Sequence, residues 1–165
     1  MINTLFQAVQ TNDMEVLKNL LSKDADLANN ENEEGLTPLG YAAHFGHKGA
    51  VQLLLDYGAN VNAISHSKIN YIPSNTALHA AIAGERNLDV ISLLLAHQAK
   101  TDIFDSNGQT CLHTAAYHSH NQEIIKLLID YGAQLNAKTK DGKTAFEIAM
   151  EQDHYQIAQI LKDGK

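Results

Sequence analysis

Apolar residues recur along this chain in short helical patterns, and residues 37–62 show the pattern most completely. Two apolar stripes are present, made of Leu39, Ala42 and Ala43 and then of Val51, Leu54 and Leu55. Spacings of three and four residues are typical of amphipathic helices. The first stripe consists mostly of small residues, which let a neighbouring helix approach closely. The pattern therefore predicts a short hairpin of two helices.

Local signals mark the ends of both predicted helices. Thr37 can cap a helix start, and Pro38 loses no hydrogen bond in the first helical position. Gly46 and Gly58 suit the left-handed conformation that often ends a helix. The stretch that follows, residues 59–75, is rich in Asn and Ser, which predicts a projecting turn.

The hairpin pattern returns along the whole chain. Threonines open its copies at Thr37, Thr76, Thr110 and Thr144, and Asn3 stands in the equivalent place at the start. The intervals are 34, 39, 34 and 34 residues. Hairpins this short bury their apolar faces only by stacking. We therefore expect one domain, 1–165, with an N-terminal cap at about 3–36, repeats at 37–75, 76–109 and 110–143, and a C-terminal cap at 144–165.

The repeating motif resembles the ankyrin repeat. The second copy reads TPLGYAA and then LLLDYGANVN, and later copies keep the Thr and His as Thr76-Ala77-Leu78-His79 and Thr110-Cys111-Leu112-His113. The family signature is T-P-L-H-x-A over about 33 residues. The resemblance implies an all-α ankyrin-repeat solenoid, in which stacked helix-turn-helix units carry projecting β-turn fingers.

Departures from the motif give specific expectations. Gly40 replaces the motif histidine, so we expect a weaker cap and slight fraying there. Gln98 stands where Gly58 and Gly132 stand, so we expect a left-handed non-glycine residue. Thr144 and Glu147 predict a capping box.

The connection before Thr76 is longer than the others, and its enlarged part spans residues 65–75. Ile69, Tyr71 and Ile72 lie on this expected projection. Inserted loops in solenoids commonly carry binding. The alternative is that these side chains fold back on neighbouring fingers.

Charge and composition narrow the function classes. The net charge is −7, which argues against a nucleic-acid backbone as partner. Residues 1–36 carry a net charge of −5, whereas the last finger holds the basic residues Lys138, Lys140 and Lys143. We expect this charge difference along the chain to fix the orientation of a partner with complementary charges. The single Cys111 fits a reducing compartment. Without a recognisable signal peptide or membrane span, we expect a cytoplasmic protein, or a secreted one if it is an effector.

The resemblance also implies where a partner would bind, namely the concave face of finger tips and exposed first-helix positions. We assign these positions by aligning each copy with the family motif, and we add the apolar residues of the long loop. The candidates are Glu33, Glu34, Leu36, His44, Phe45, Ile69, Tyr71, Ile72, Asn75, Ser106, Asn107, Gln109, Tyr117, His118, Lys140, Lys143 and Glu151. Phe45 and Tyr117 stand out, because no core position there needs an aromatic residue and aromatics dominate binding hot spots.

The nine histidines do not predict a metal site or an active site. His79 and His113 match the motif histidine and are expected to bond backbone and threonine, and His47 and His120 match its Gly-His position. The pairs His44/His47 and His118/His120 lack a complementary Cys or carboxylate at a suitable spacing. We expect no metal, no cofactor and no catalysis, and a packing role for Cys111.

Asn62 and Asn136 close their hairpins, where similar eukaryotic repeats can be hydroxylated; otherwise their side chains bond the turn backbone. The sequence thus favours a monomeric module that binds another protein. The alternatives are an inhibitor or immunity-type protein that occludes a toxin or enzyme, and a host-directed effector adaptor.

Overall fold

The computed structural model describes residues 1–118 and 121–164, in two compact units, Met1–Ala99 and Lys100–Lys165. Unit 1 contains α1 (Ile2–Thr11), α2 (Met14–Lys23), the 3-10 helix η1 (Ala25–Asn29), α3 (Pro38–His44), α4 (Lys48–Asp56), α5 (Ala77–Ala83) and α6 (Leu88–Ala96). Unit 2 contains α7 (Cys111–His118), α8 (Gln122–Asp130), α9 (Ala145–Glu151) and α10 (Tyr155–Asp163). Strands are absent from these described ranges, which confirms the all-α prediction.

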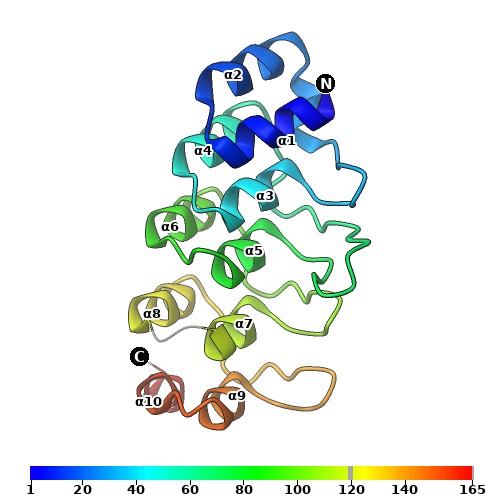
Figure 1. Cartoon of the computed structure of the whole chain (residues 1–165). Helices are drawn as coiled ribbons and strands as arrows, with labels where there is room; N and C mark the ends of the chain where they lie inside the picture. The colour runs from blue at the N-terminus through cyan, green and yellow to red at the C-terminus, as the bar shows by residue number, and fades with distance from the viewer. Residues whose placement is uncertain (119–120, 165) are drawn as a thin grey trace. The chain divides into compact units, whose positions relative to one another are not determined.

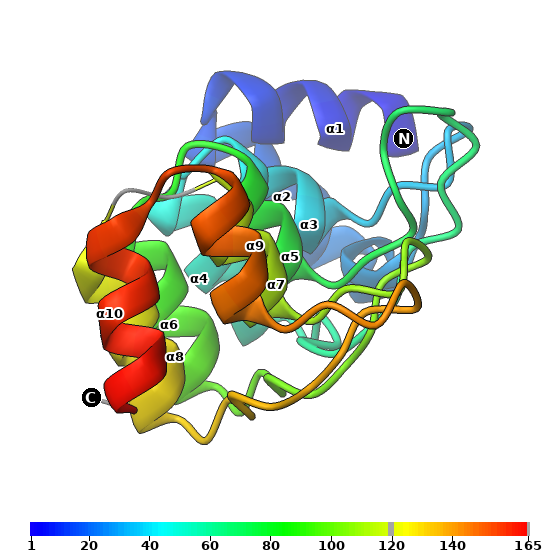
Figure 2. The same cartoon turned by 90° about the horizontal axis from the view of Figure 1, so that it is seen from below.

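The helices of each unit form two layers (Figure 1). In unit 1 the first helices α1, α3 and α5 pack in succession, and so do the second helices α2, α4 and α6. In unit 2, α7 packs on α9 and α8 on α10. In unit 1 the long polar connections before α3 and α5 project on the side of the first helices (Figure 2). These connections are the fingers expected from the sequence.

Small residues allow this close packing. Ala42, Ala43, Ala81, Ala115 and Ala116 are all completely buried on first helices. The second helices supply larger side chains such as Leu17, Leu54 and Leu128, which are also completely buried. Burying one such leucine contributes about 1.5–3 kcal/mol. Cys111 is likewise fully buried, as expected for a packing role.

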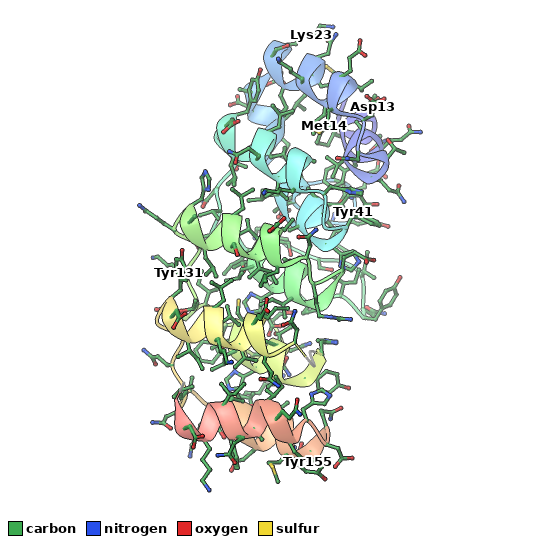
Figure 3. All side chains as sticks on the ribbon, turned by 90° about the vertical axis from the view of Figure 1, so that its left-hand side faces the viewer. Asp13, Met14, Lys23, Tyr41, Tyr131 and Tyr155 are labelled. Carbon is green, nitrogen blue, oxygen red and sulfur yellow. The ribbon has the colours of Figure 1, made fainter. Side chains whose placement is uncertain are left out.

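Side-chain caps fix most of the helix starts. The Thr37 hydroxyl accepts a hydrogen bond from the Gly40 amide at 3.0 Å, so α3 keeps its cap although Gly40 has no side chain to extend the network. The fraying expected there stays a prediction. The box of Thr144 and Glu147 is present at α9. Asp13 caps α2 through the Val16 amide (Figure 3).

Left-handed residues lie where the motif requires them. Gly58 and Gly132 have φ of 87° and 89°, and Gln98 in the equivalent position has φ 67°, which confirms the expectation for a non-glycine residue. The first copy differs from the motif, because Asn3 lies inside α1, and Met1 takes the N-cap position without a side-chain bond. That the whole chain forms one domain with the repeat boundaries given above stays a prediction.

His113 links two repeats of unit 2 from a buried position, 1% exposed. Its Nδ1 accepts the Thr110 backbone N–H at 3.0 Å, and its Nε2 lies 2.9 Å from the Ala137 carbonyl oxygen. A backbone amide can only donate, so the proton must be on Nε2, which donates to Ala137. Burial lowers the pKa of His113, and the bond to the Ala137 carbonyl opposes this shift in part.

We expect His113 to make unit 2 less stable at acidic pH. Folding lowers the pKa of His113, so its contribution to the free energy of unfolding is complete at pH values above the unfolded pKa of about 6.5. This contribution is lost as the pH falls below that value, by at most about 1.4 kcal/mol per pH unit. Hydrogen exchange of α7 amides between pH 8 and pH 5, after correction for intrinsic rates, measures this slope. His113→Gln should be less stable at pH 8 by about 1–3 kcal/mol and show a shallower slope. The control His97→Gln replaces an exposed histidine and should change neither the stability at pH 8 nor the slope. Parallel slopes in the wild type and in His113→Gln would refute the assignment of this pH dependence to His113.

Candidate functional site

The long loop, residues 64–75, is an ordered hairpin-like finger in unit 1. The Ser65 amide donates to the Asn75 carbonyl at 2.9 Å, and the Asn75 amide donates back to the Ser65 hydroxyl at 3.1 Å. The Ser67 amide donates to the Ser74 hydroxyl at 3.1 Å. Serine side chains thus tie the two limbs of the loop together below its tip.

The same loop is attached to the first finger, residues 31–36. The amides of His66 and Lys68 donate to the carbonyls of Gly35 and Glu34, each at 2.9 Å. The Lys68 ammonium donates to the Glu33 carbonyl at 3.0 Å. These bonds make one composite surface of two segments that are about thirty residues apart in sequence.

A side-chain pair adds to this attachment. His66 Nδ1 lies 2.7 Å from the Glu31 carboxylate, which also accepts the His66 amide at 3.1 Å. The imidazole is largely exposed, so the ion pair itself contributes little beyond holding the geometry.

Gly35 permits the contact between the two fingers. It has φ 77°, and a Cβ at this position would collide with the His66 backbone carbonyl. The adjacent turn is closed by Asn32, whose side-chain oxygen accepts the amides of Glu34 at 3.0 Å and Leu36 at 2.9 Å. The first finger is therefore fixed from within and by the loop.

Exposure differs sharply among the apolar residues of the loop. Tyr71 is 86% exposed at the tip and Ile64 is 44% exposed at the start of the loop, whereas Ile69 and Ile72 are half-buried. The polar Asn75 is half-buried as well. Beside the loop, Glu33 and Glu34 are exposed and Leu36 is half-buried. The backbone of His66 and Lys68 attaches the loop to the first finger, and the turn at Ile69–Ile72 presents the Tyr71 ring to solvent. Whether Ile69 and Ile72 pack on a neighbouring finger stays a prediction.

Phe45 lies in an aromatic cluster and is half-buried. Its ring packs edge-on against Tyr41 with centroids 5.1 Å apart and stacks on His47 at 5.9 Å. Phe6 of α1 also packs edge-on against Tyr41, with ring centroids 5.1 Å apart. Burial, followed by the charge of Glu34, raises the pKa of Tyr41. The sequence favoured an exposed Phe45, with crowding against its neighbours as the alternative; the cluster leaves Phe45 half-buried and gives it packing contacts within unit 1. Its role in binding stays a prediction.

The exposed His44 completes the candidates on α3. Its ring lies edge-on to Phe45 at 5.4 Å, and its backbone carbonyl accepts the Glu85 amide at 2.9 Å. His47 Nε2 lies 3.1 Å from the Gln10 carbonyl and so joins two repeats, as expected for a structural histidine.

In unit 2 the candidates lie on two fingers and on α7. Tyr117, 47% exposed, packs edge-on against the exposed His118 at 4.9 Å. The buried Asp105 closes the finger of residues 105–109 by accepting the amides of Asn107 and Gln109, both at 2.9 Å. Ser106 and Asn107 are exposed on that finger, and Gln109 is half-buried.

The last finger carries the remaining candidates. Lys143 forms an exposed ion pair with Glu151 at 2.8 Å, and this hydrogen bond raises the pKa of Lys143. Lys140 is exposed and lies against Gly108 of the preceding finger. Two of the predicted basic and acidic contact residues therefore already pair with each other.

The residues that close the finger turns were not predicted from the sequence. Asn32, Asp105 and Thr139 each accept an amide within their own turn, and each precedes by three residues a glycine with positive φ: Gly35, Gly108 and Gly142. This spacing of a polar residue and a glycine was a usable signal. The attachment of the loop to Gly35 left no comparable signal.

The described residues do not form a metal site. Residues 1–118 and 121–164 contain no group of three or more His, Cys, Asp or Glu side chains placed to hold a metal ion. His120, part of one discounted histidine pair, lies outside the described residues. Among the helices in these ranges, none is both long and apolar enough to cross a membrane. Asn62 donates to the Gln98 carbonyl at 3.1 Å, so its side chain joins two turns, and Asn136 is exposed.

Comparison with known proteins identifies the family. The family model for ankyrin repeats (3 copies) matches residues 5–105 and 78–165. The chain therefore belongs to the ankyrin repeat family, a class of non-catalytic modules that generally mediate protein–protein interaction.

Curated relatives agree with this assignment. An ankyrin repeat protein of Fowlpox virus (strain NVSL) is 35% identical over 107 residues, which is 64% of this chain and 30% of the relative. Rabankyrin-5 of Homo sapiens is 40% identical over 74 residues, 42% of this chain and 6% of the relative. Rabankyrin-5 of Mus musculus is 36% identical over 81 residues, 48% of this chain and 6% of the relative. The chain thus spans less than a third of each of these relatives.

The attachment of the loop to the first finger can be tested with one pair of variants. Gly35→Ala should destabilise unit 1 by more than the about 1–2 kcal/mol of backbone strain alone, because its methyl group meets the His66 carbonyl. The His66 and Lys68 amides should then exchange faster with deuterium. Gly58→Ala is the matched control, since Gly58 also has positive φ but has open space around its Cβ position. Equal protection of His66 and Lys68 in both variants would contradict the contact.

Proposed function

We propose that this chain binds a partner protein, without catalysis, through its fingers and the exposed positions of its first helices. The observation that carries the proposal is Tyr71, 86% exposed at the tip of a loop whose base is fixed by hydrogen bonds. Exposed aromatic side chains are enriched among interface hot spots. A loop ordered before binding loses less conformational entropy on association.

Tyr117 supports the same proposal in unit 2. It is 47% exposed, and its ring rests on His118 at the end of α7. Phe45 contributes less to such a surface, since Tyr41 and His47 cover part of it. In the proposal each unit contributes its own predicted finger residues, such as Glu33 and Glu34 in unit 1, and Lys143 with Glu151 acts as a pair in unit 2. We propose that the module is cytoplasmic, because the single buried Cys111 fits a reducing compartment. We also propose that it is monomeric, because Gln156 and Gln159 on the last helix are exposed, as expected of a capping repeat.

Binding is tested by affinity capture from a lysate of the source organism. A specific partner should be retained by the wild-type chain and lost, with affinity falling about 30-fold or more, in Tyr71→Ser. Tyr117→Ser shows whether unit 2 contributes. The control is Tyr131→Ser, because Tyr131, labelled in Figure 3, is 49% exposed at the C-terminal end of α8 and is not one of the candidate contact residues. Partners retained equally by all variants would contradict finger-mediated binding.

An activity assay on the captured partner decides between simple recognition and inhibition. If the partner is an enzyme or toxin, the inhibitor alternative requires its activity to fall in proportion to the bound fraction. Unchanged activity at saturation would leave an adaptor.

A further inference from the structure

The composite surface of the first finger and the loop carries uncompensated negative charge. Glu33 and Glu34 are exposed, and within residues 1–118 and 121–164 their carboxylates accept no hydrogen bond and form no ion pair. Their backbone carbonyls are occupied by Lys68, so the finger is held while its carboxylates face solvent.

Nearby cations do not cancel this charge. Lys68 is the single lysine or arginine in residues 31–36 and 64–75, against Glu31, Glu33 and Glu34. Residues 1–99 hold ten acidic and five basic side chains, a net charge of −5 with histidine neutral. Burial and, to a lesser extent, the charge of Glu34 raise the pKa of Tyr41 on α3.

An apolar anchor point lies beside these carboxylates. Tyr71 follows Lys68 by three residues, so its backbone lies within about 10 Å of the Lys68 backbone, which bonds the first finger. The half-buried Ile69 and Ile72 flank Tyr71 in sequence. A partner segment of a few residues that covers the tyrosine ring can therefore also reach the first finger with Glu33 and Glu34.

We infer that this composite surface binds a basic segment of a partner protein, in which lysine or arginine flanks an aliphatic or aromatic side chain. This inference rests on the proposed function and specifies the chemistry of its partner. The apolar side chain would pack on Tyr71, and the cations would pair with Glu33 and Glu34. An acidic segment would meet like charges, which disfavour the wrong partner.

A synthetic probe tests this chemistry on the full chain. The probe is the capped peptide Lys-Gly-Lys-Leu-Phe-Leu-Lys-Gly-Lys, compared with a version that has Glu for every Lys and one that has Ser for Leu-Phe-Leu. In NMR titrations the first peptide should shift the amides of residues 31–36 and 64–75. We expect at least fivefold weaker binding for the Ser version and no saturable binding for the Glu version.

Matched variants separate local from overall charge. Glu33→Gln/Glu34→Gln and Tyr71→Ser should each weaken the first peptide at least fivefold. The control Glu15→Gln/Asp26→Asn removes the same charge from exposed positions elsewhere in unit 1 and should change affinity less than twofold. An equal loss in the control, or equal binding of the Glu peptide, would overturn the inference.

The natural partner distinguishes this inference from the proposed function. If Tyr71→Ser abolishes capture while Glu33→Gln/Glu34→Gln leaves it unchanged, the finger binds a protein but the inferred basic chemistry is wrong. If both variants abolish capture, the charge inference is supported on the natural ligand.

Discussion

The helices in residues 1–118 and 121–164 are too short to be stable alone, and the arrangement of each unit follows from that constraint. Helix α3 has only seven residues and is about 10 Å long, whereas isolated helices shorter than about 12–15 residues have only marginal stability in water. Its stability comes from α1, α4 and α5, which pack around it. Because Ala42 and Ala43 are completely buried at these contacts, their small size determines how closely the repeats approach. A change in this stripe therefore acts on two repeats at once.

The fingers of unit 1 depend on their neighbours in the same way. An inserted loop carries backbone amides that need acceptors. The amides of Ser65, Ser67 and Asn75 find acceptors within the loop, whereas those of His66 and Lys68 find them on the first finger. The inserted loop is thus held by hydrogen bonds to the finger of the preceding repeat. Gly35 leaves room for this contact because it has no Cβ atom.

Local signals in the sequence predicted most of the fold. The caps of Thr37 and Thr144, the left-handed Gln98 and the threonine–histidine pairs each depend on residues within a few positions of one another. The candidate site was less accessible, because its contacts are long-range. The attachment of the loop joins the His66 and Gly35 backbones, which are thirty-one residues apart in sequence. Backbone carbonyls are present at every position, so residue identity at Glu34 and Gly35 did not mark them as acceptors.

The residues that fold this protein and the residues proposed for recognition are different sets. Leu39, Ala42 and Leu54 are buried and belong to the repeated apolar pattern, whereas Glu33, Glu34 and Tyr71 are exposed. In the finger of residues 105–109 the positions of Glu33 and Glu34 are taken by Ser106 and Asn107, and Tyr71 lies in the enlarged loop. A surface charge can therefore change with little effect on packing. The aromatic ring supplies contact area, and the carboxylates select among partners by their charge. Since shared positions are already committed to stacking, information about the partner must lie where the copies differ. The enlarged loop is the largest such difference, and it is also fixed in place by the first finger.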